Sequence, residues 1–405
     1  MKRKLKVNLL VLIIIAIILG VACGNFFSQW MVRLFITFNS IFSNFLSFSI
    51  PLIILGFVTP AISEIGKGVG KMLVVTILLS YGFTIGAGFM SYFTSVSFFP
   101  LMLGSEMKAT VVSNNLDTLS PYFTIPMPPL MDIMSALIFS FVMGVGITFL
   151  KNGQNVLARF FSEFRNIIAW VISRIIVPLL PIYIFGIFLN MTFSGEVASV
   201  LTTFFKIIVV IFIMHIVWLI GLYLIGACFS KNIKNPFKLL WLMMPAYFTA
   251  LGTQSSAATI PVTLRQVEKM GVSEATAGFT VPLCATIDLS GSALKIVACS
   301  LALMMVKGMD YNLSMFAYFI AMVGITLVAA PGVPGGAIMA ALGLLSSILG
   351  FSDADNALII ALYIAMDSFG TACNVTGDGA ISLIIDRFFS TSEKIETDLI
   401  SNSLC

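Results

Sequence analysis

The stretch that decides the fold is ALIIALYIAMDSFGTACNVTGDGAISLII, residues 357–385. It is mostly apolar, yet four polar residues recur at intervals of four, three and four: Asp367, Thr371, Asn374 and Asp378. This spacing puts all four on one face of a helix. A carboxylate inside the membrane is costly unless it is paired or faces water, so the pattern indicates a ligand site. The alternative, polar contacts that only hold helices together, is typical of Ser, Thr and Asn and seldom of two aspartates.

The composition of the whole chain is that of a membrane protein. Of 405 residues, 59% are hydrophobic and 10% are charged, and the mean hydropathy is +1.05. Soluble domains carry about 25% charged residues. The net charge of +4 is small and no basic run alternates with aromatics, which argues against a nucleic-acid partner. We expect the single histidine, His215, to be hydrogen-bonded within an apolar span.

Apolar runs of about 20 residues are long enough to cross the bilayer. They predict eight spans, at 7–27, 34–60, 72–95, 122–150, 168–191, 201–229, 275–305 and 356–389. Two further apolar stretches, 238–263 and 315–349, are interrupted at the middle, and we expect them to re-enter the membrane without crossing it. The first apolar run is long for a cleaved signal peptide, so we expect it to remain as the first span.

The positions of lysine and arginine favour this layout. With a cytoplasmic N-terminus, sixteen of the 22 basic residues lie on the cytoplasmic side, three lie outside and three fall within spans. Cytoplasmic loops carry an excess of Lys and Arg, so the bias predicts that both termini are cytoplasmic. The expected location is the plasma membrane, as the inner membrane of a bacterium.

The last third of the chain reads as two matching halves. Residues 238–305 contain a hairpin interrupted at 252–257 and a helix with a polar break at 286–292. Residues 315–389 contain a hairpin interrupted at 330–336 and then the helix quoted above. Corresponding interruptions in two halves are typical of inverted repeats with a binding site near the middle of the membrane. Two ordinary kinked helices are the simpler alternative.

Four motifs in this region resemble those of the dicarboxylate/amino acid:cation symporters, the glutamate-transporter family. They are TQSSAATIP (253–261), PLCATIDLSGSA (282–293), PGVPGG (331–336) and TACNVTGD (371–378). The family shows a serine-rich first hairpin tip, an NMDGT stretch, a Gly/Pro-rich second tip and a D-x-x-R-T-x-x-N-V-x-G-D helix.

The resemblance implies an all-α multi-pass membrane protein with eight transmembrane helices and two re-entrant helical hairpins. Residues 1–70 and 101–195 would form a static scaffold through which the subunit assembles as a homotrimer. Residues 71–100 and 196–405 would form a transport domain that carries substrate and Na⁺ across the membrane as a rigid body, in an elevator-type movement. The second hairpin would act as the outer gate.

The resemblance also implies roles for individual residues. Asp367 matches the aspartate that holds the substrate ammonium, and Thr371 and Asn374 match further substrate contacts. The two hairpin tips supply the remaining substrate-binding positions: Ser255, Ser256, Val333, Pro334 and Gly335. Asp378 matches a sodium-binding carboxylate, and the expected cation site comprises Asp378, Asn374, Asp288, Cys284, Ser290 and Ser80. Oxygen atoms are the ligands that hard cations prefer, so Na⁺ is the expected coupling ion and H⁺ the alternative.

Two departures from the family pattern bear on the substrate. The family arginine that binds an acidic side chain is Gly370 here, and the alternative arginine in the first hairpin is Gln254. With no other cation in the motifs, the second carboxylate of an acidic substrate would be buried without a partner, which is strongly disfavoured. We therefore expect a small neutral amino acid, with an acidic amino acid or a C4 dicarboxylate as the alternative.

Further departures bear on the coupling ion. The aspartate of NMDGT is Ser290 here, and Asp288 stands where the family has asparagine, so the charge has moved by two residues. The second hairpin tip reads VAAPG, without the Ser or Thr usual before its glycines. Lys295 lies seven residues after Asp288. We expect this lysine to snorkel to the interface; the alternative is a tethered cation that replaces an ion.

Three other functions fit the sequence less well. An intramembrane aspartyl protease would use two buried aspartates, but presenilin-like enzymes carry GxGD where this chain reads VTGD at 375–378. A dedicated channel would spread polar residues over several helices, whereas here they concentrate in the last third. A substrate sensor on the same fold would bind without transporting. We therefore expect a transporter and not an enzyme.

Overall fold

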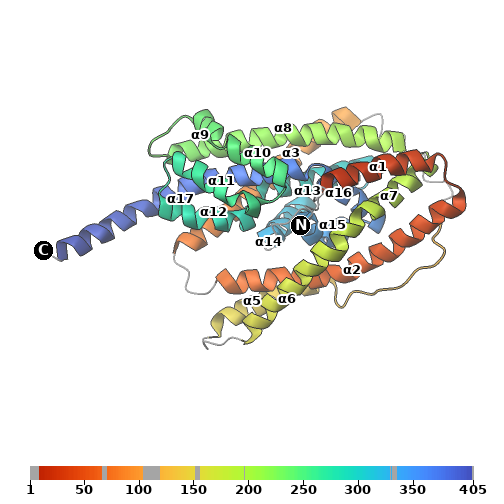
Figure 1. The fold of residues 1–405 in the computed structure, drawn as a ribbon, viewed down its shortest axis with the longest axis horizontal. Coiled ribbons are helices and arrows are strands. Elements are labelled where there is room, and N and C mark those ends of the chain that lie inside the picture. Colours follow the sequence, from red (N-terminus) through yellow and green to blue (C-terminus); the bar gives the residue numbers. More distant parts are fainter. Residues whose placement is uncertain are drawn as a thin grey trace, which may run out of the picture.

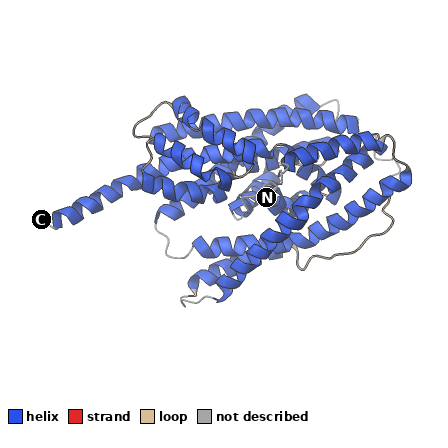
Figure 2. Ribbon diagram, viewed as in Figure 1, coloured by secondary structure: helices blue, strands red, loops and turns tan. Residues whose placement is uncertain are grey.

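The computed structural model describes residues 9–65, 71–103, 119–150, 156–195, 197–328, 330 and 335–403. Within these ranges all regular secondary structure is helical and no strand occurs (Figure 2). The helices are α1 (Leu9–Gly24), α2 (Gln29–Ile65), α3 (Lys71–Leu103), α5 (Ile133–Phe149), α6 (Val156–Val171), the π-helical turn η1 (Ile172–Ile176), α7 (Val177–Phe193), α8 (Val197–Phe229), α9 (Pro236–Leu242), α10 (Met244–Thr253), α11 (Ser256–Lys269), α12 (Glu274–Ile287), α13 (Ser290–Lys307), α14 (Leu313–Val328), α15 (Gly336–Leu349), α16 (Asp353–Ala365) and α17 (Asp367–Ser403).

The described helices include several that match the length of a bilayer. Five helical stretches are long and apolar enough to cross: Gln29–Pro60, Lys71–Met102, Val156–Phe193, Leu201–Phe229 and Glu274–Lys307. The bent pair α16 and α17 makes a sixth. The apolar parts of α1 and α5 are shorter, so the expected total of eight crossings stays a prediction at these two helices. The all-α membrane fold itself is confirmed.

The predicted span at 122–150 is wrong in its first third. Residues 119–132 form no helix, and the helical part of this span begins only at Ile133. Four prolines in this segment remove backbone donors and exclude a continuous helix. The segment runs instead beside α2, where Asn44 donates to the Ile125 carbonyl at 2.8 Å and Arg33 donates to the Ser120 carbonyl at 3.0 Å.

Two groups of helices pack mainly among themselves. In the first, α2 contacts α5, α6 and α7, and α1 packs along α7. In the second, α3 packs on α13 and α14, while α17 contacts α8, α10 and α12. Figure 1 shows α2, α5 and α6 on the opposite side of the molecule from α8, α9 and α10. Helices α15 and α16 join the groups, because α15 contacts α2 and α16 contacts α1 and α7.

Both predicted hairpins are present. In the first, α10 ends at Thr253, Gln254 takes a left-handed conformation with φ of 53°, and α11 begins at Ser256. In the second, α14 ends at Val328 and α15 begins at Gly336. The two helices of each hairpin pack against each other. The first interruption therefore falls inside the predicted interval 252–257, and the described ends of the second, Ala330 and Gly335, fall inside the predicted interval 330–336.

The two broken spans differ in how well the sequence predicts them. The break between α12 and α13 lies at Asp288 and Leu289, inside the expected interval 286–292. The last span, expected as one continuous helix, is broken at Met366 and bent by 62°. Asp367 consequently begins α17, where a carboxylate is favoured by the positive end of the helix dipole.

Close packing between α13 and α17 depends on Gly291. A Cβ atom at this position would lie 2.7 Å from Cys373 Cβ and 2.8 Å from the Gly370 carbonyl oxygen. A backbone carbonyl cannot rotate away, so any side chain here must push the two helices apart. The break in the seventh span can approach α17 only because residue 291 is a glycine.

Gly291→Ala is expected to lower the stability of the folded protein by about 1–3 kcal/mol, because it overpacks this contact. Thermal unfolding of the detergent-purified protein measures the effect. The matched control is Gly278→Ala in α12, where no atom lies within 4 Å of the added Cβ. The control is expected to keep or slightly raise the melting temperature. Equal melting temperatures for the two variants would contradict the packing described.

Candidate functional site

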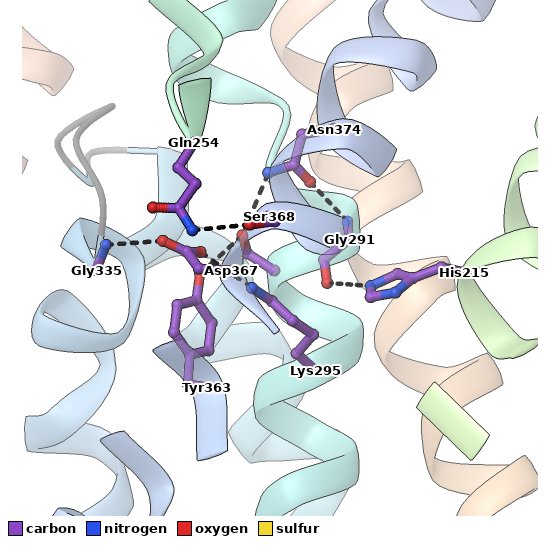
Figure 3. Close-up of polar contacts among 10 residues, drawn as sticks. His215, Gln254, Gly291, Lys295, Gly335, Tyr363, Asp367, Ser368 and Asn374 are labelled. Atoms are coloured by element: carbon purple, nitrogen blue, oxygen red, sulfur yellow. Dashed lines mark hydrogen bonds and ion pairs between the residues drawn. The ribbon is translucent and has the colours of Figure 1, made fainter. Parts of the chain in front are cut away.

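The tips of both hairpins meet the bend of the last span (Figure 3). The backbone N–H of Gly335, at the second tip, donates to Asp367 Oδ2 at 3.0 Å. The side chain of Gln254, at the first tip, donates from Nε2 to Ser368 Oγ at 2.7 Å. Asp367 and Ser368 are the first two residues of α17. Three chain interruptions from different parts of the sequence therefore converge on one place.

The carboxylate of Asp367 is paired inside the protein. Its Oδ1 lies 3.1 Å from Nζ of Lys295, whose side chain is fully buried on α13. The same Nζ lies 3.6 Å from the centre of the Tyr363 ring, so an aromatic face contacts the ammonium as well. Figure 3 shows the lysine reaching across the space between α13 and the start of α17. A buried carboxylate and a buried ammonium thus neutralise each other at the substrate position that the resemblance implies.

The expectation that Lys295 snorkels to the interface is wrong. Its side chain points into the protein because Gly370, one turn after Asp367, leaves the room that it needs. A Cβ atom at residue 370 would collide with Cε and Nζ of Lys295. The statement that no other cation lies in the motifs is wrong for the same reason. A positive charge stands beside position 370, supplied from α13 instead of α17.

Asn374 holds the N-terminus of α13 in place. Its Oδ1 accepts from the Gly291 backbone N–H at 2.8 Å, and its Nδ2 donates to Ser292 Oγ at 3.2 Å. No side chain from α13 itself caps this helix start. His215, from α8, donates from Nε2 to the Gly291 carbonyl at 3.0 Å, since a carbonyl can only accept. The prediction that His215 is hydrogen-bonded within the membrane is confirmed.

A second polar cluster lies about three turns along α17 from Asp367. Both carboxylate oxygens of Asp288, Oγ of Ser290 and Oδ1 of Asp378 are buried and have no hydrogen-bond partner among the described residues. A Cβ at Gly377 would lie 3.0 Å from Asp288 Oδ2 and 3.9 Å from Ser290 Oγ, so these groups lie against the backbone next to Asp378. Buried oxygens without donors are costly, and a cation supplies what they lack.

The cluster suits Na⁺ better than a transition metal. Within the described ranges no group of three or more His, Cys, Asp or Glu residues has the geometry to bind a metal. The cluster instead presents two carboxylates and a hydroxyl beside the carbonyls of a broken helix, and oxygen donors of this kind favour a hard cation. Cys284 and Ser80 border the cluster, with Sγ and Oγ 4.0 Å apart, and the Cys284 carbonyl accepts from the Asp288 N–H at 2.8 Å.

The remaining residues expected in the substrate site do not all lie next to Asp367. Ser255 caps α11, since its Oγ accepts from the Ala258 N–H at 3.3 Å. Ser256 and Thr371 are buried, Thr371 one turn after Asp367. Gly335 contacts Asp367 directly. Val333 and Pro334 lie outside the described residues.

Several members of the site were not predicted from the sequence. Tyr363 donates to Ser292 Oγ at 3.0 Å and contacts Lys295, and Gln254 and Ser368 join the first hairpin to α17. Two features of the sequence could have pointed to this arrangement: Gly370 stands in place of the family arginine, and Lys295 lies in the other broken helix. Only a structure shows that these two positions touch.

This geometry defines a class of protein. Interrupted helical hairpins and broken spans that meet around a buried polar site are typical of secondary transporters. Comparison with known proteins specifies the class further. Residues 9–388 match the model of the sodium:dicarboxylate symporter family, so the chain belongs to that family. The expected family, and with it a transporter in place of an enzyme, is confirmed.

Individual relatives are distant. The chain is 25% identical to the serine/threonine transporter SstT of Acinetobacter baumannii over 399 residues, which cover 94% of this chain and 97% of SstT. It is 26% identical to the mouse neutral amino acid transporter B(0) over 284 residues, 68% of this chain and 50% of that protein. It is 28% identical to mouse excitatory amino acid transporter 4 over 65% of this chain and 47% of that protein. The chain thus spans about half the length of these two mouse relatives.

The fit between Gly370 and Lys295 can be tested by a double-mutant cycle. Gly370→Ala is expected to lower stability in the natural background because its Cβ displaces Lys295 from Asp367. In a Lys295→Ala background the same change is expected to have little further effect. Thermal unfolding of the four proteins gives the coupling energy, expected in the range of about 0.5–3 kcal/mol for residues in contact. Additive effects of the two changes would show that the side chains do not meet.

Proposed function

We propose that this protein is a secondary active symporter that couples the inward flux of Na⁺ to the uptake of a small neutral amino acid. The observation that carries the proposal is the convergence of both hairpin tips on Asp367 and Ser368, beside a cluster of buried, unpartnered oxygens. Membership in a sodium:dicarboxylate symporter family supports coupled transport.

Asp367 is the proposed partner of the substrate ammonium. It is a buried carboxylate at the meeting point of two interrupted hairpins, and a carboxylate pairs strongly with an ammonium away from water. The N-terminus of α11, at the first hairpin tip, offers free backbone N–H groups to the substrate carboxylate. Thr371 lies on α17 between Asp367 and Asp378, which belongs to the cation cluster.

The charges of the site favour a neutral substrate. Asp367 and Lys295 cancel, and a zwitterionic amino acid adds no net charge. Two monovalent cations then balance Asp288 and Asp378 when these are ionised. An acidic substrate would add one more buried negative charge, which a low-dielectric site disfavours. Relatives named for neutral amino acids, SstT and B(0), agree with this choice.

An acidic amino acid or dicarboxylate is the second candidate, and one observation favours it. The ammonium of Lys295 lies next to position 370, from which the arginine of acid-transporting family members extends. A second substrate carboxylate would therefore find a cation close by. Replacement of Na⁺ by H⁺ is the corresponding alternative for the ion, since Asp288 and Asp378 are carboxylates that can also be protonated.

The movement that we propose is of the elevator type. The packing of α3 with α13 and α14, and of α17 with α8, α10 and α12, supports a transport domain made of 71–100 and 196–405. The contacts among α1, α2, α5, α6 and α7 support a scaffold made of 1–70 and 101–195. The same proposal includes a homotrimer built on the scaffold, cytoplasmic termini and a bacterial inner membrane.

A thermal-shift panel tests the substrate. Twenty amino acids and several C4 dicarboxylates are each added to purified protein in NaCl and in choline chloride. A ligand at about 100 times its Kd adds about 2.7 kcal/mol of stability to the folded state. The neutral-substrate proposal expects a rise in melting temperature with a small neutral amino acid, in NaCl only. A rise with acids alone would support the second candidate, and a rise independent of Na⁺ would support proton coupling.

Asp367→Asn is expected to abolish the shift caused by the amino acid, because loss of the charged partner weakens binding by about 1.5–3 kcal/mol or more. The quantity compared is the shift and not the melting temperature itself, which is expected to fall since Lys295 loses its partner. Asp310→Asn, in an exposed loop, is the control and should keep the full shift. An undiminished shift in Asp367→Asn would remove this residue from the substrate site.

Asp378→Asn is expected to abolish stabilisation by NaCl relative to choline chloride, because the cluster loses one of its two carboxylates. Asp386→Asn is a matched control two turns further along α17, where the carboxylate pairs with Lys231 at 2.9 Å and not with the cluster. The control should lose some stability but keep the response to Na⁺. If both variants respond to Na⁺ like the natural protein, the ion binds elsewhere.

A further inference from the structure

Lys295 is a charged group in the site that, for the proposed neutral substrate, only balances the charge of Asp367. Its side chain is fully buried, and no other lysine or arginine of the described chain is buried in this way. A buried ammonium is costly unless it is paired. Here it is held by Asp367 at 3.1 Å and by the ring of Tyr363 at 3.6 Å. Gly370 provides the space that its Cε and Nζ occupy.

Both oxygens of the Asp367 carboxylate are engaged in this arrangement. Oδ1 faces the Lys295 ammonium, and Oδ2 accepts from the N–H of Gly335 at the second hairpin tip. The hairpin tip therefore rests on a carboxylate that already has a counter-charge. Figure 3 shows the lysine and the tip on either side of the same carboxylate. The protein's own ammonium stands where the proposed function places the ammonium of the substrate.

We propose that Lys295 is an internal occupant of the ammonium subsite, which substrate must displace and which neutralises Asp367 when no substrate is bound. The proposal rests on the proposed function, since it assumes that a substrate ammonium binds Asp367. When substrate arrives, its ammonium takes over Oδ1 and Lys295 moves back toward the Tyr363 ring. When substrate leaves, Lys295 returns to the carboxylate.

The consequence concerns the return of the empty carrier. With the second hairpin as the outer gate, which the resemblance implies, net uptake requires this hairpin to close over an empty site, whereas exchange of substrate for substrate requires closure only over a filled one. Closing Gly335 onto an uncompensated carboxylate would bury an unpaired charge, which is strongly disfavoured. The tethered ammonium removes that cost. The empty carrier can then return without a second cation taken from solution.

The test separates net uptake from exchange in reconstituted vesicles. Lys295→Met keeps the length of the side chain and removes its charge, and Lys295→Gln keeps a donor for Asp367 in case the first variant does not fold. Net uptake is measured into empty vesicles, and exchange into vesicles preloaded with unlabelled substrate. Substrate binding is measured by thermal shift.

Both variants are expected to lose net uptake about tenfold or more relative to exchange. Lys295→Met is also expected to bind the amino acid about tenfold more tightly, because the internal competitor for Asp367 is gone, and Lys295→Gln by a smaller factor, because its amide still donates to Asp367. Lys307→Met is the matched control: it breaks a lysine–aspartate pair of 2.7 Å with Asp355, outside the site, and should leave the ratio and the affinity unchanged.

Two results would overturn the proposal, and they are distinguishable. If the natural protein transports in both assays while Lys295→Met and Lys295→Gln keep its ratio and affinity, Lys295 only stabilises the fold, and the proposed function stands. If the natural protein itself shows no exchange of any amino acid in NaCl, the proposed function fails and this proposal fails with it.

Discussion

The site depends on the constraint that a carboxylate buried at membrane depth must have partners. Asp367 has two, the ammonium of Lys295 and the backbone N–H of Gly335. These contacts join three separate elements, α13, α17 and the second hairpin. Because an unpaired charge there would cost several kcal/mol, the arrangement is held as a unit. The position of the hairpin tip is thereby linked to the charge state of the site.

The site also depends on helices that end within the membrane. A helix that ends inside the membrane leaves N–H and carbonyl groups without partners, and these must be satisfied by the protein or by a ligand. Asn374 satisfies the start of α13, whereas the oxygens of Asp288, Ser290 and Asp378 have no donor among the described residues. At the break between α12 and α13, a side chain from α17 therefore supplies the hydrogen-bond partner that the backbone lacks. The adjacent cluster presents oxygens to which a small cation can bind.

Much of the fold could be read from local sequence. Apolar runs of sufficient length determine membrane helices, and small or polar residues within such runs determine where the backbone turns back. The hairpin interruptions near Gln254 and Gly335 follow from this rule. The stripe Asp367, Thr371, Asn374 and Asp378 follows from the period of the helix alone. Local sequence failed at 122–132, where prolines interrupt an apolar run, and at Met366, where a helix bends.

The sequence by itself determined which residues carry charge within the membrane and which segments cannot remain helical, because both follow from residue type and spacing along one chain. Only the tertiary structure decided how those charges are paired. Lys295 and Gly370 are 75 positions apart in the chain, and nothing local shows that the lysine fills the space left by the glycine. A lysine of this length reaches either the interface or the interior. The packing of α13 against α17 leaves it only the interior, where Asp367 is the partner.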